Sequence, residues 1–355
     1  MNRPLKILAV AAGAIALLAS VGAIRTLSTA GQFTTIKPLG GETCREMAGI
    51  VGAEDIAIDR AAGIAYVSST DRAAARRGED VRGEIFALGL GGTDAVPTPA
   101  TSDAPDDFRP AGVSLWSPAD GERRLFVVNR RRAGPPTVEV FAVDSGRLAH
   151  LRTIRDPGIA SPNDLHAVGA DRFYVTNDGG EGARRIVDFA LQRLTSYVAY
   201  FDGEAARVAA GDFGFANGIN ASADGATIYV SDTFTRRLRF FGVDAGSGAL
   251  METGSLMLGT GLDNIDVDAT GSLWIAAHPK LLDLMLYVGG WRERAPSQVI
   301  RAVPAAGGGG EARTILLDLG KRLSAASVAA NVGDRYLVGS LIDSKMLICP
   351  AASGG

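Results

Sequence analysis

Residues 163–177 read NDLHAVGADRFYVTN, and this stretch contains the unit from which the fold can be predicted. A polar pair, Asn163-Asp164, opens a short strand, and after a turn Phe173–Asn177 forms a second, mostly apolar strand. Alternating apolar residues bounded by Gly and Asp are typical of short antiparallel strands. The unit is therefore predicted to be a β-hairpin that begins and ends in polar residues.

The same unit occurs six times, opening at residues 54, 111, 163, 217, 263 and 326, at intervals of 46 to 63 residues. Between the copies lie further apolar stretches, such as Glu84–Leu88 and Val138–Val143, which supply outer strands. Units of this length that each form a four-stranded sheet are typical of propeller blades. We therefore predict an all-β fold, a six-bladed β-propeller.

Two segments have helical rather than strand periodicity. Arg184–Leu194 and Lys280–Trp291 place apolar residues at helical spacing, and both come directly after a second strand. They are predicted to be short helices over the mouth of the central tunnel, acting as a lid or a membrane-facing surface. Packing against the blades is the alternative.

In most of the repeated units, the residues that open the first strand have side-chain oxygens that could bind a metal ion. The innermost strand of a blade lines the central channel, so these residues converge on one axis: Glu54, Asp55, Asn163, Asp164, Asn217, Asp263 and Asn264. Buried together, four carboxylates would repel one another unless a cation neutralised them. Oxygen ligands select calcium first and magnesium second. Each pair alone could be a turn, but recurrence at one register favours a metal site.

The second strands run antiparallel to the first, so their last residues reach the same mouth of the tunnel. Arg130, Asn177 and Asp232 are there predicted to contact a substrate, with an exposed loop position as the alternative. His278 ends the fifth second strand, where an imidazole beside a metal could transfer protons.

The N-terminus predicts export. Arg3 and Lys6 precede a run of uncharged, small or apolar residues from Ile7 to Ile24, as in a signal peptide or membrane anchor. Residues 1–30 are therefore interpreted as a leader, either cleaved or retained as an anchor that associates with a membrane through residues 7–24. Residues 31–355 are predicted to form the propeller outside the cytoplasm, in the periplasm or the extracellular space.

Two cysteines, Cys44 and Cys349, stand near the two ends of the predicted propeller. In an oxidising compartment we expect them to pair, with two free thiols as the alternative. Such a bridge would stabilise the fold by about 5 kcal/mol in the chain-entropy account.

Charge and motifs exclude several classes of function. The chain has 36 basic and 39 acidic residues, so no net basic field is available for nucleic acid, and none is expected as a partner. No Gly-x-Ser-x-Gly elbow precedes a histidine, which argues against a serine hydrolase.

Four segments resemble the metal-binding segments of the paraoxonase/arylesterase family, and the likeness runs from about Cys44 to Cys349. These segments are Glu54-Asp55-Ile56, Ser161–Leu165, Phe215–Asn220 and Leu262–Ile265. The resemblance implies hydrolysis of lactones and aryl esters, a disulfide that closes the ring, a leader that can remain as an anchor, and two calcium ions.

Carried over residue by residue, the resemblance implies two sets of ligands. The catalytic ion would be held by Glu54, Asn163, Asn217, Asp263 and Asn264. The structural ion would be held by Asp55, Asp164 and the backbone carbonyl of Val113. The exposed calcium would polarise the carbonyl of the ester while water attacks.

One departure from the family concerns the base. Ala111 and Arg130 stand where mammalian members have a histidine pair, so activation of water falls to Glu54, Asp263 or His278. Two alternative functions follow: a metal-binding propeller that binds a ligand without turnover, and a gluconolactonase-like or strictosidine-synthase-like enzyme.

Overall fold

The computed structural model describes residues 3–351, apart from 93–94, 119–120, 180–181 and 306. Its strands form six antiparallel sheets of four strands each. The first three blades contain, from the inside outward, β2 (Ala53–Asp59), β3 (Ile64–Ser69), β4 (Glu84–Gly89), β5 (Thr98–Pro99); β6 (Pro110–Trp116), β7 (Arg124–Asn129), β8 (Thr137–Asp144), β9 (Arg147–Ile154); β10 (Pro162–Ala167), β11 (Phe173–Asn177), β12 (Ser196–Phe201), β13 (Ala206–Phe213).

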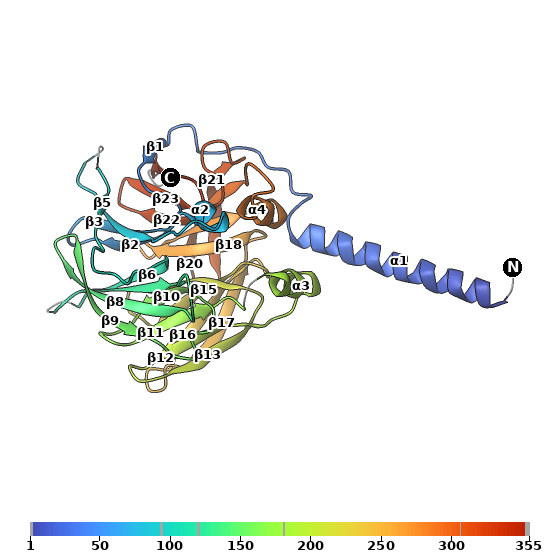
Figure 1. Ribbon diagram of the computed structural model, residues 1–355, viewed down its shortest axis with the longest axis horizontal. Coiled ribbons are helices and arrows are strands. Elements are labelled where there is room, and N and C mark those ends of the chain that lie inside the picture. The colour runs from blue at the N-terminus through green and yellow to red at the C-terminus, as the bar shows by residue number, and fades with distance from the viewer. Residues whose placement is uncertain (1–2, 93–94, 119–120, 180–181, 306, 352–355) are drawn as a thin grey trace.

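The remaining three blades contain β14 (Ala216–Ala221), β15 (Thr227–Asp232), β16 (Arg237–Val243), β17 (Leu250–Met257); β18 (Gly261–Val267), β19 (Leu273–His278), β20 (Ser297–Pro304), β21 (Gly310–Asp318); β22 (Ala326–Asn331), β23 (Arg335–Ser340), β24 (Lys345–Pro350), β1 (Arg45–Ala48). Each innermost strand contacts the innermost strand of the next blade, and β22 contacts β2, so the ring is closed. The prediction of a six-bladed propeller is confirmed (Figure 1).

The ring is closed by pairing its two ends. β1 runs antiparallel to β24, with Arg45 opposite Ile348 and Ala48 opposite Lys345, so the start of the chain supplies the outermost strand of the last blade. Cys44 and Cys349 form a disulfide beside this pairing, which confirms the predicted bridge.

Among the described residues, the core of the ring consists of six apolar wedges, one between each pair of neighbouring blades. Both faces of a blade are covered in this arrangement, so a second strand such as Leu125–Val128 is buried throughout. This is why the second strands read as continuous apolar runs rather than as alternating patterns.

Three short helices follow second strands, at the end of the tunnel where those strands finish. α3 (Ala183–Leu191) and α4 (Leu281–Val288) correspond to the two predicted helices, whereas α2 (Arg72–Arg76) was not predicted. Two apolar clusters smaller than those of the ring involve α3 and α4. α1 (Arg3–Thr29) ends beside α3 and α4 (Figure 1), where the Leu281 amide donates to the Ala30 carbonyl at 2.9 Å.

Candidate metal centre and active site

The seven predicted ligand side chains lie where the innermost strands depart from regular pairing. The register of every innermost strand is interrupted near its start, and in four blades the interrupted positions are Glu54-Asp55, Asn163-Asp164, Asn217-Gly218 and Asp263-Asn264. A bulge re-aims the side chains of the residues that it displaces. All seven predicted side chains are buried around the ring of innermost strands.

The backbone of the bulges is held by hydroxyl groups from the second strands. Ser68 accepts from the Asp55 amide at 3.0 Å, Thr176 from the Asp164 amide at 3.0 Å, and Ser231 from the Gly218 amide at 2.8 Å. These residues were missed in the sequence, although a Ser or Thr recurs at one position of three second strands.

Two of the interrupted positions require glycine. A Cβ atom on Gly112 would lie 2.4 Å from the Cα of Asp164, and one on Gly218 would lie 2.6 Å from the Cα of Asn264. Neighbouring innermost strands therefore approach closely at the level of the candidate ligands. Here glycine is required because of contact with a neighbouring backbone.

Four buried oxygens at the site have no hydrogen-bond donor among the described residues: Glu54 Oε2, Asn163 Oδ1, Asn217 Oδ1 and Asn264 Oδ1. Two of the amides are fixed through their nitrogens, since Asn217 Nδ2 donates to Thr233 Oγ1 and Asn264 Nδ2 donates to the Glu54 carbonyl, both at 3.0 Å. A buried acceptor without a donor costs about 1–3 kcal/mol. A hard cation would satisfy all four oxygens at once.

Within the part of the chain that the structure describes, no cluster of three His, Cys, Asp or Glu side chains forms a metal site by itself. The donor set here is different in kind, because three of the four unsatisfied oxygens belong to amides. Amide and carboxylate oxygens together are ligands that suit calcium and are poor ligands for zinc or copper.

Asp55 and Asp164 form a second group, each bound to the next blade. Asp55 Oδ2 accepts from the Val113 amide at 2.7 Å, and Asp164 Oδ2 accepts from the Ile219 amide at 2.8 Å. Burial raises the pKa of Asp55 to about 7 and the pKa of Asp164 well above its ordinary value. Two such carboxyls favour either a shared proton or a cation between them.

Glu54 is buried like these two carboxyls, but the positively charged side chain of Arg72 lies near it. Burial raises the pKa of Glu54 to about 8, while the Arg72 guanidinium, whose Nη2 lies 4.0 Å from Glu54 Oε2, opposes that rise. Arg72 was missed because it belongs to the short helix α2, whose one sequence signal is its N-cap Asp71, which accepts from the Ala74 amide at 2.8 Å.

His278 lies beside a candidate ligand. Its Nε2 is 2.6 Å from Asp263 Oδ2, its side chain is almost fully buried, and its Nδ1 has no partner among the described residues. The sequence prediction placed this histidine near the metal ligands, and the structure joins it directly to Asp263. Such a carboxylate fixes the ring and its tautomer.

Of the three predicted substrate contacts, only Arg130 borders an open space. Its guanidinium pairs with Asp178, its Nε donates to the Pro162 carbonyl at 2.9 Å, and it lines a cavity of about 310 Å³ with Pro136 and Ser161.

Asn177 and Asp232 are buried and engaged with the backbone of their own loops. Asn177 Oδ1 accepts from the Ala160 and Ser161 amides at 2.9 and 3.0 Å. The two oxygens of Asp232 accept from the Gly214 and Phe215 amides, both at 3.0 Å. The structure therefore gives both residues a loop-fixing role in place of the predicted contact with substrate.

With this geometry, residues 98–350 match the family described as arylesterase. The chain belongs to the arylesterase family. It is 32% identical over 248 residues to human serum paraoxonase/arylesterase 1, covering 68% of each chain. It is 32% identical to chicken serum paraoxonase/arylesterase 2, covering 79% of this chain and 81% of the relative.

Two solved structures show the same fold at low sequence identity. A luciferin-regenerating enzyme has a TM-score of 0.55 and 13% identity, and the match covers 88% of this chain and 96% of that one. A gluconolactonase from Xanthomonas campestris has a TM-score of 0.51 and 17% identity, with 89% and 97% covered. These likenesses support the propeller fold alone.

Proposed function

We propose that this protein is a calcium-dependent hydrolase of lactones and aryl esters, acting at the mouth of the central tunnel. The observation that carries the proposal is the group of four buried oxygens without donors, on Glu54, Asn163, Asn217 and Asn264. Family membership supports the same chemistry, since the relatives include proteins named paraoxonase, arylesterase and lactonase.

The residues that would hold the catalytic ion are these four and Asp263. When bound, calcium would polarise the carbonyl of the ester and stabilise the negative charge that develops on its oxygen. Arg72, beside Glu54, adds positive charge at the same level of the tunnel. Arg130 lies in the adjoining cavity, where a cation suits a substrate oxygen or an acidic substituent.

His278 is the group best placed to accept a proton from water. If its Nε2–H donates to Asp263 Oδ2, the lone pair is on Nδ1, which is the atom without a partner among the described residues. A neutral imidazole held in this way can act as a general base. Nδ1 would take the proton as water attacks the carbonyl carbon and return it to the leaving oxygen.

We also propose a second, structural ion held by Asp55 and Asp164, with Val113 beside it. Support comes from the two carboxylates, which lie on alternate blades and each reach the next innermost strand. A cation between them would join three or more blades at the axis of the propeller and relieve the repulsion between the carboxyls.

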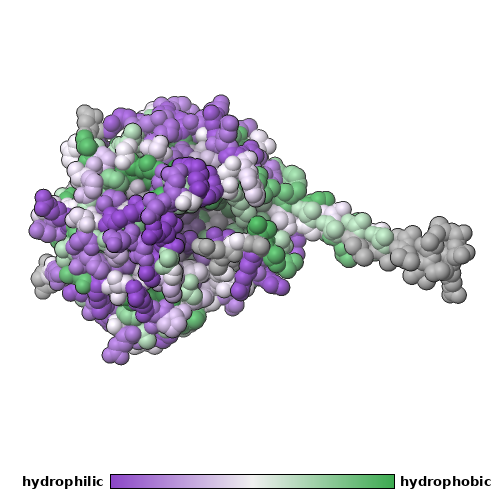
Figure 2. All heavy atoms as spheres, in the orientation of Figure 1, coloured by the Kyte–Doolittle hydropathy of each residue, from purple (hydrophilic) through white to green (hydrophobic). Residues whose placement is uncertain are grey.

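The location that we propose is outside the cytoplasm, with residues 1–30 as leader or anchor and residues 31–355 as the propeller. Residues 1–2 and 352–355 lie outside the part of the chain that the structure describes. The segment Ala12–Thr29 is long and apolar enough to cross a membrane, and the disulfide fits an oxidising compartment. Figure 2 shows apolar surface where α1 meets the body.

Exposed apolar side chains near that junction favour retention at a membrane. They are Phe33, Ile186, Leu191 and Trp291. Association through residues 7–24 would place the tunnel mouth near the lipid surface, because α3 and α4 follow the second strands that end at that mouth.

The test uses the full chain in detergent, freed of metal with EDTA and then given calcium or magnesium. Hydrolysis of phenyl acetate and of a lactone series should appear with calcium and disappear with EDTA, and the melting temperature should rise with calcium. Stabilisation by calcium without turnover of any ester would instead support the alternative suggested by Ala111 and Arg130, a propeller that binds ligand without reaction. No response to calcium would refute the site.

A further inference from the structure

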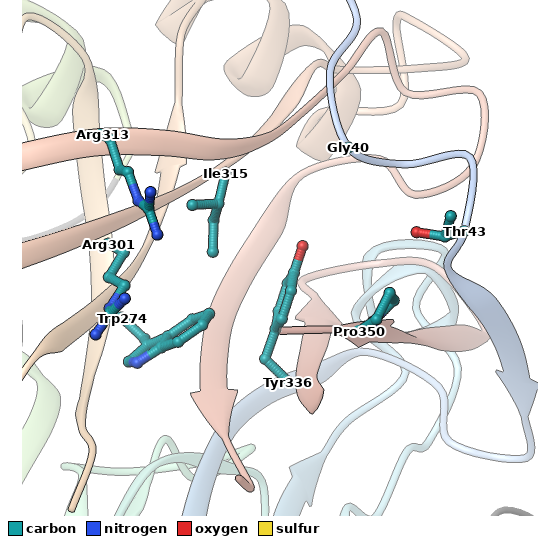
Figure 3. Close-up of a pocket in the computed structure, with 8 residues that line it drawn as sticks. All are labelled: Gly40, Thr43, Trp274, Arg301, Arg313, Ile315, Tyr336 and Pro350. Carbon is teal, nitrogen blue, oxygen red and sulfur yellow. The ribbon is translucent and has the colours of Figure 1, made fainter. Parts of the chain in front are cut away.

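A second cavity, of about 200 Å³, lies between blades 5 and 6 (Figure 3). It is at the end of the propeller opposite the candidate metal centre. The strand β19 shows this position, because it runs from one end of the propeller to the other. Trp274, near the start of β19, lines the cavity, and His278, at the end of β19, lies beside Asp263 at the candidate metal centre. The cavity shares no residue with the proposed active site.

Three lining residues form one row across blade 5. Trp274 on β19 is opposite Arg301 on β20, and Arg301 is opposite Arg313 on β21. Directly paired residues of antiparallel strands lie on the same face of the sheet, and two like charges placed there repel each other. Figure 3 shows both guanidinium groups on one side of the Trp274 indole.

The two arginines have no carboxylate partner in the described residues. Arg301 makes one side-chain hydrogen bond, from Nη2 to Ser272 Oγ at 3.0 Å, and its buried Nε has no acceptor. Arg313 is exposed and makes no ion pair there, not even with Glu311, which is two residues earlier on the same strand. The Arg301 guanidinium lies 5.9 Å from the centroid of the Trp274 ring, and the neighbouring carboxylate, Asp268, is engaged by the Ser272 amide and the indole. Two guanidinium groups without a direct carboxylate partner can bind an anion through two parallel hydrogen bonds.

The rest of the cavity is mostly apolar. The rings of Trp274 and Tyr336 have centroids 5.1 Å apart, Ile315 lies beside them, and the indole is held by a 2.8 Å hydrogen bond from its Nε1 to Asp268. A volume of about 200 Å³ is many times the minimum of about 10–15 Å³ that a single water requires. Such a volume suits one small ring that carries a charged substituent.

The wall is formed before any ligand binds. Gly40, with φ +73°, passes so close to β21 that a Cβ atom would lie 2.2 Å from the Ile315 carbonyl oxygen. Leu39 pairs with Leu317 on the same strand, and Cys44 ties this segment to Cys349. A preformed wall reduces the ordering cost of binding.

We propose that this cavity binds a small carboxylate attached to a flat apolar group, with the carboxylate between Arg301 and Arg313 and the ring against Trp274. The inference is independent of the proposed hydrolase function, because the two sites lie at opposite ends of the propeller.

Titration of the full chain with benzoate, followed by calorimetry and tryptophan fluorescence, tests the proposal. Benzoate should bind and change the fluorescence, and benzamide, which has the same shape without the charge, should bind at least tenfold more weakly, as expected when a hydrogen bond to a charged group is lost. Arg313→Gln and Arg301→Gln should each weaken benzoate binding by roughly tenfold or more.

The matched control is Arg147→Gln, because Arg147 is an exposed arginine on another outer strand, β9, and its replacement changes the net charge equally. This control should leave benzoate binding unchanged. Arg313 is exposed, so its variant should keep the melting temperature of the parent. Absence of benzoate binding, equal binding of benzamide, equal binding of inorganic phosphate, or wild-type affinity in Arg313→Gln would each overturn the proposal.

Discussion

Removal of the Thr176 hydroxyl should destabilise the propeller and weaken calcium binding at the candidate metal centre together. This hydroxyl accepts from the Asp164 amide at 3.0 Å and donates to the Asn217 carbonyl at 2.6 Å, and the side chain is fully buried. Thr176→Val keeps the branched shape and leaves both backbone groups without a partner. Since each unsatisfied group costs about 1–3 kcal/mol, we expect the two together to lower the free energy of unfolding by about 2–6 kcal/mol.

The matched control is Thr176→Ser, which keeps the hydroxyl and loses one methyl group, at a cost of about 1 kcal/mol. Urea unfolding of both variants with calcium present measures the difference, and calorimetry measures calcium affinity. Affinity should fall in Thr176→Val, because Asp164 and Asn217 are candidate ligands fixed by this hydroxyl. If the valine variant is no less stable than the serine variant, hydroxyl support of the bulges is refuted.

Three further predictions concern the disulfide, the buried carboxyls and the proposed base. Replacement of Cys44 and Cys349 together by alanine should lower the free energy of unfolding by about 5 kcal/mol, measured in urea, and an unchanged value would argue against a constraint on the unfolded chain. In EDTA the melting temperature should fall as pH rises from 4.5 to about 8, because folded Glu54 keeps a proton that the unfolded chain releases. Saturating calcium should remove that slope, and a slope of the opposite sign would contradict the burial of this group. His278→Gln should lower kcat by roughly 100-fold or more with a smaller change in calcium affinity, and an undiminished kcat would exclude His278 as the base.

Much of the fold could be predicted because the repeat is visible in the sequence. The six openings, the paired strands and the helices near 184 and 280 all depend on local periodicity. In five of the six blades the four strands are consecutive in the sequence, so strands that are neighbours in the sequence also pair in the sheet. The short helix α2, with five residues, carries too few positions for a periodic signal.

The site could be predicted less completely, for a physical reason. The candidate ligands at the bulges occupy the same position in each repeat, so the sequence predicts them as a group. The hydrogen-bond partners of each side chain depend on backbone geometry that the repeat does not show. Asn177 and Asp232 occupy the expected end of a second strand, yet their side chains turn back to loop amides. Arg72 enters the site from outside the repeat.

The pairing of β1 with β24 has a consequence for synthesis. The first strand of the propeller has no neighbour until the final strand has been made, so the ring stays open while about three hundred residues are produced. Strand pairings this distant in sequence form slowly. Before β1 and β24 pair, the strands at the open ends of the ring have unpaired edges that can pair with another molecule. Loss of the last six strand residues, Lys345–Pro350, would therefore leave a protein with permanent open edges, prone to aggregate rather than merely less stable.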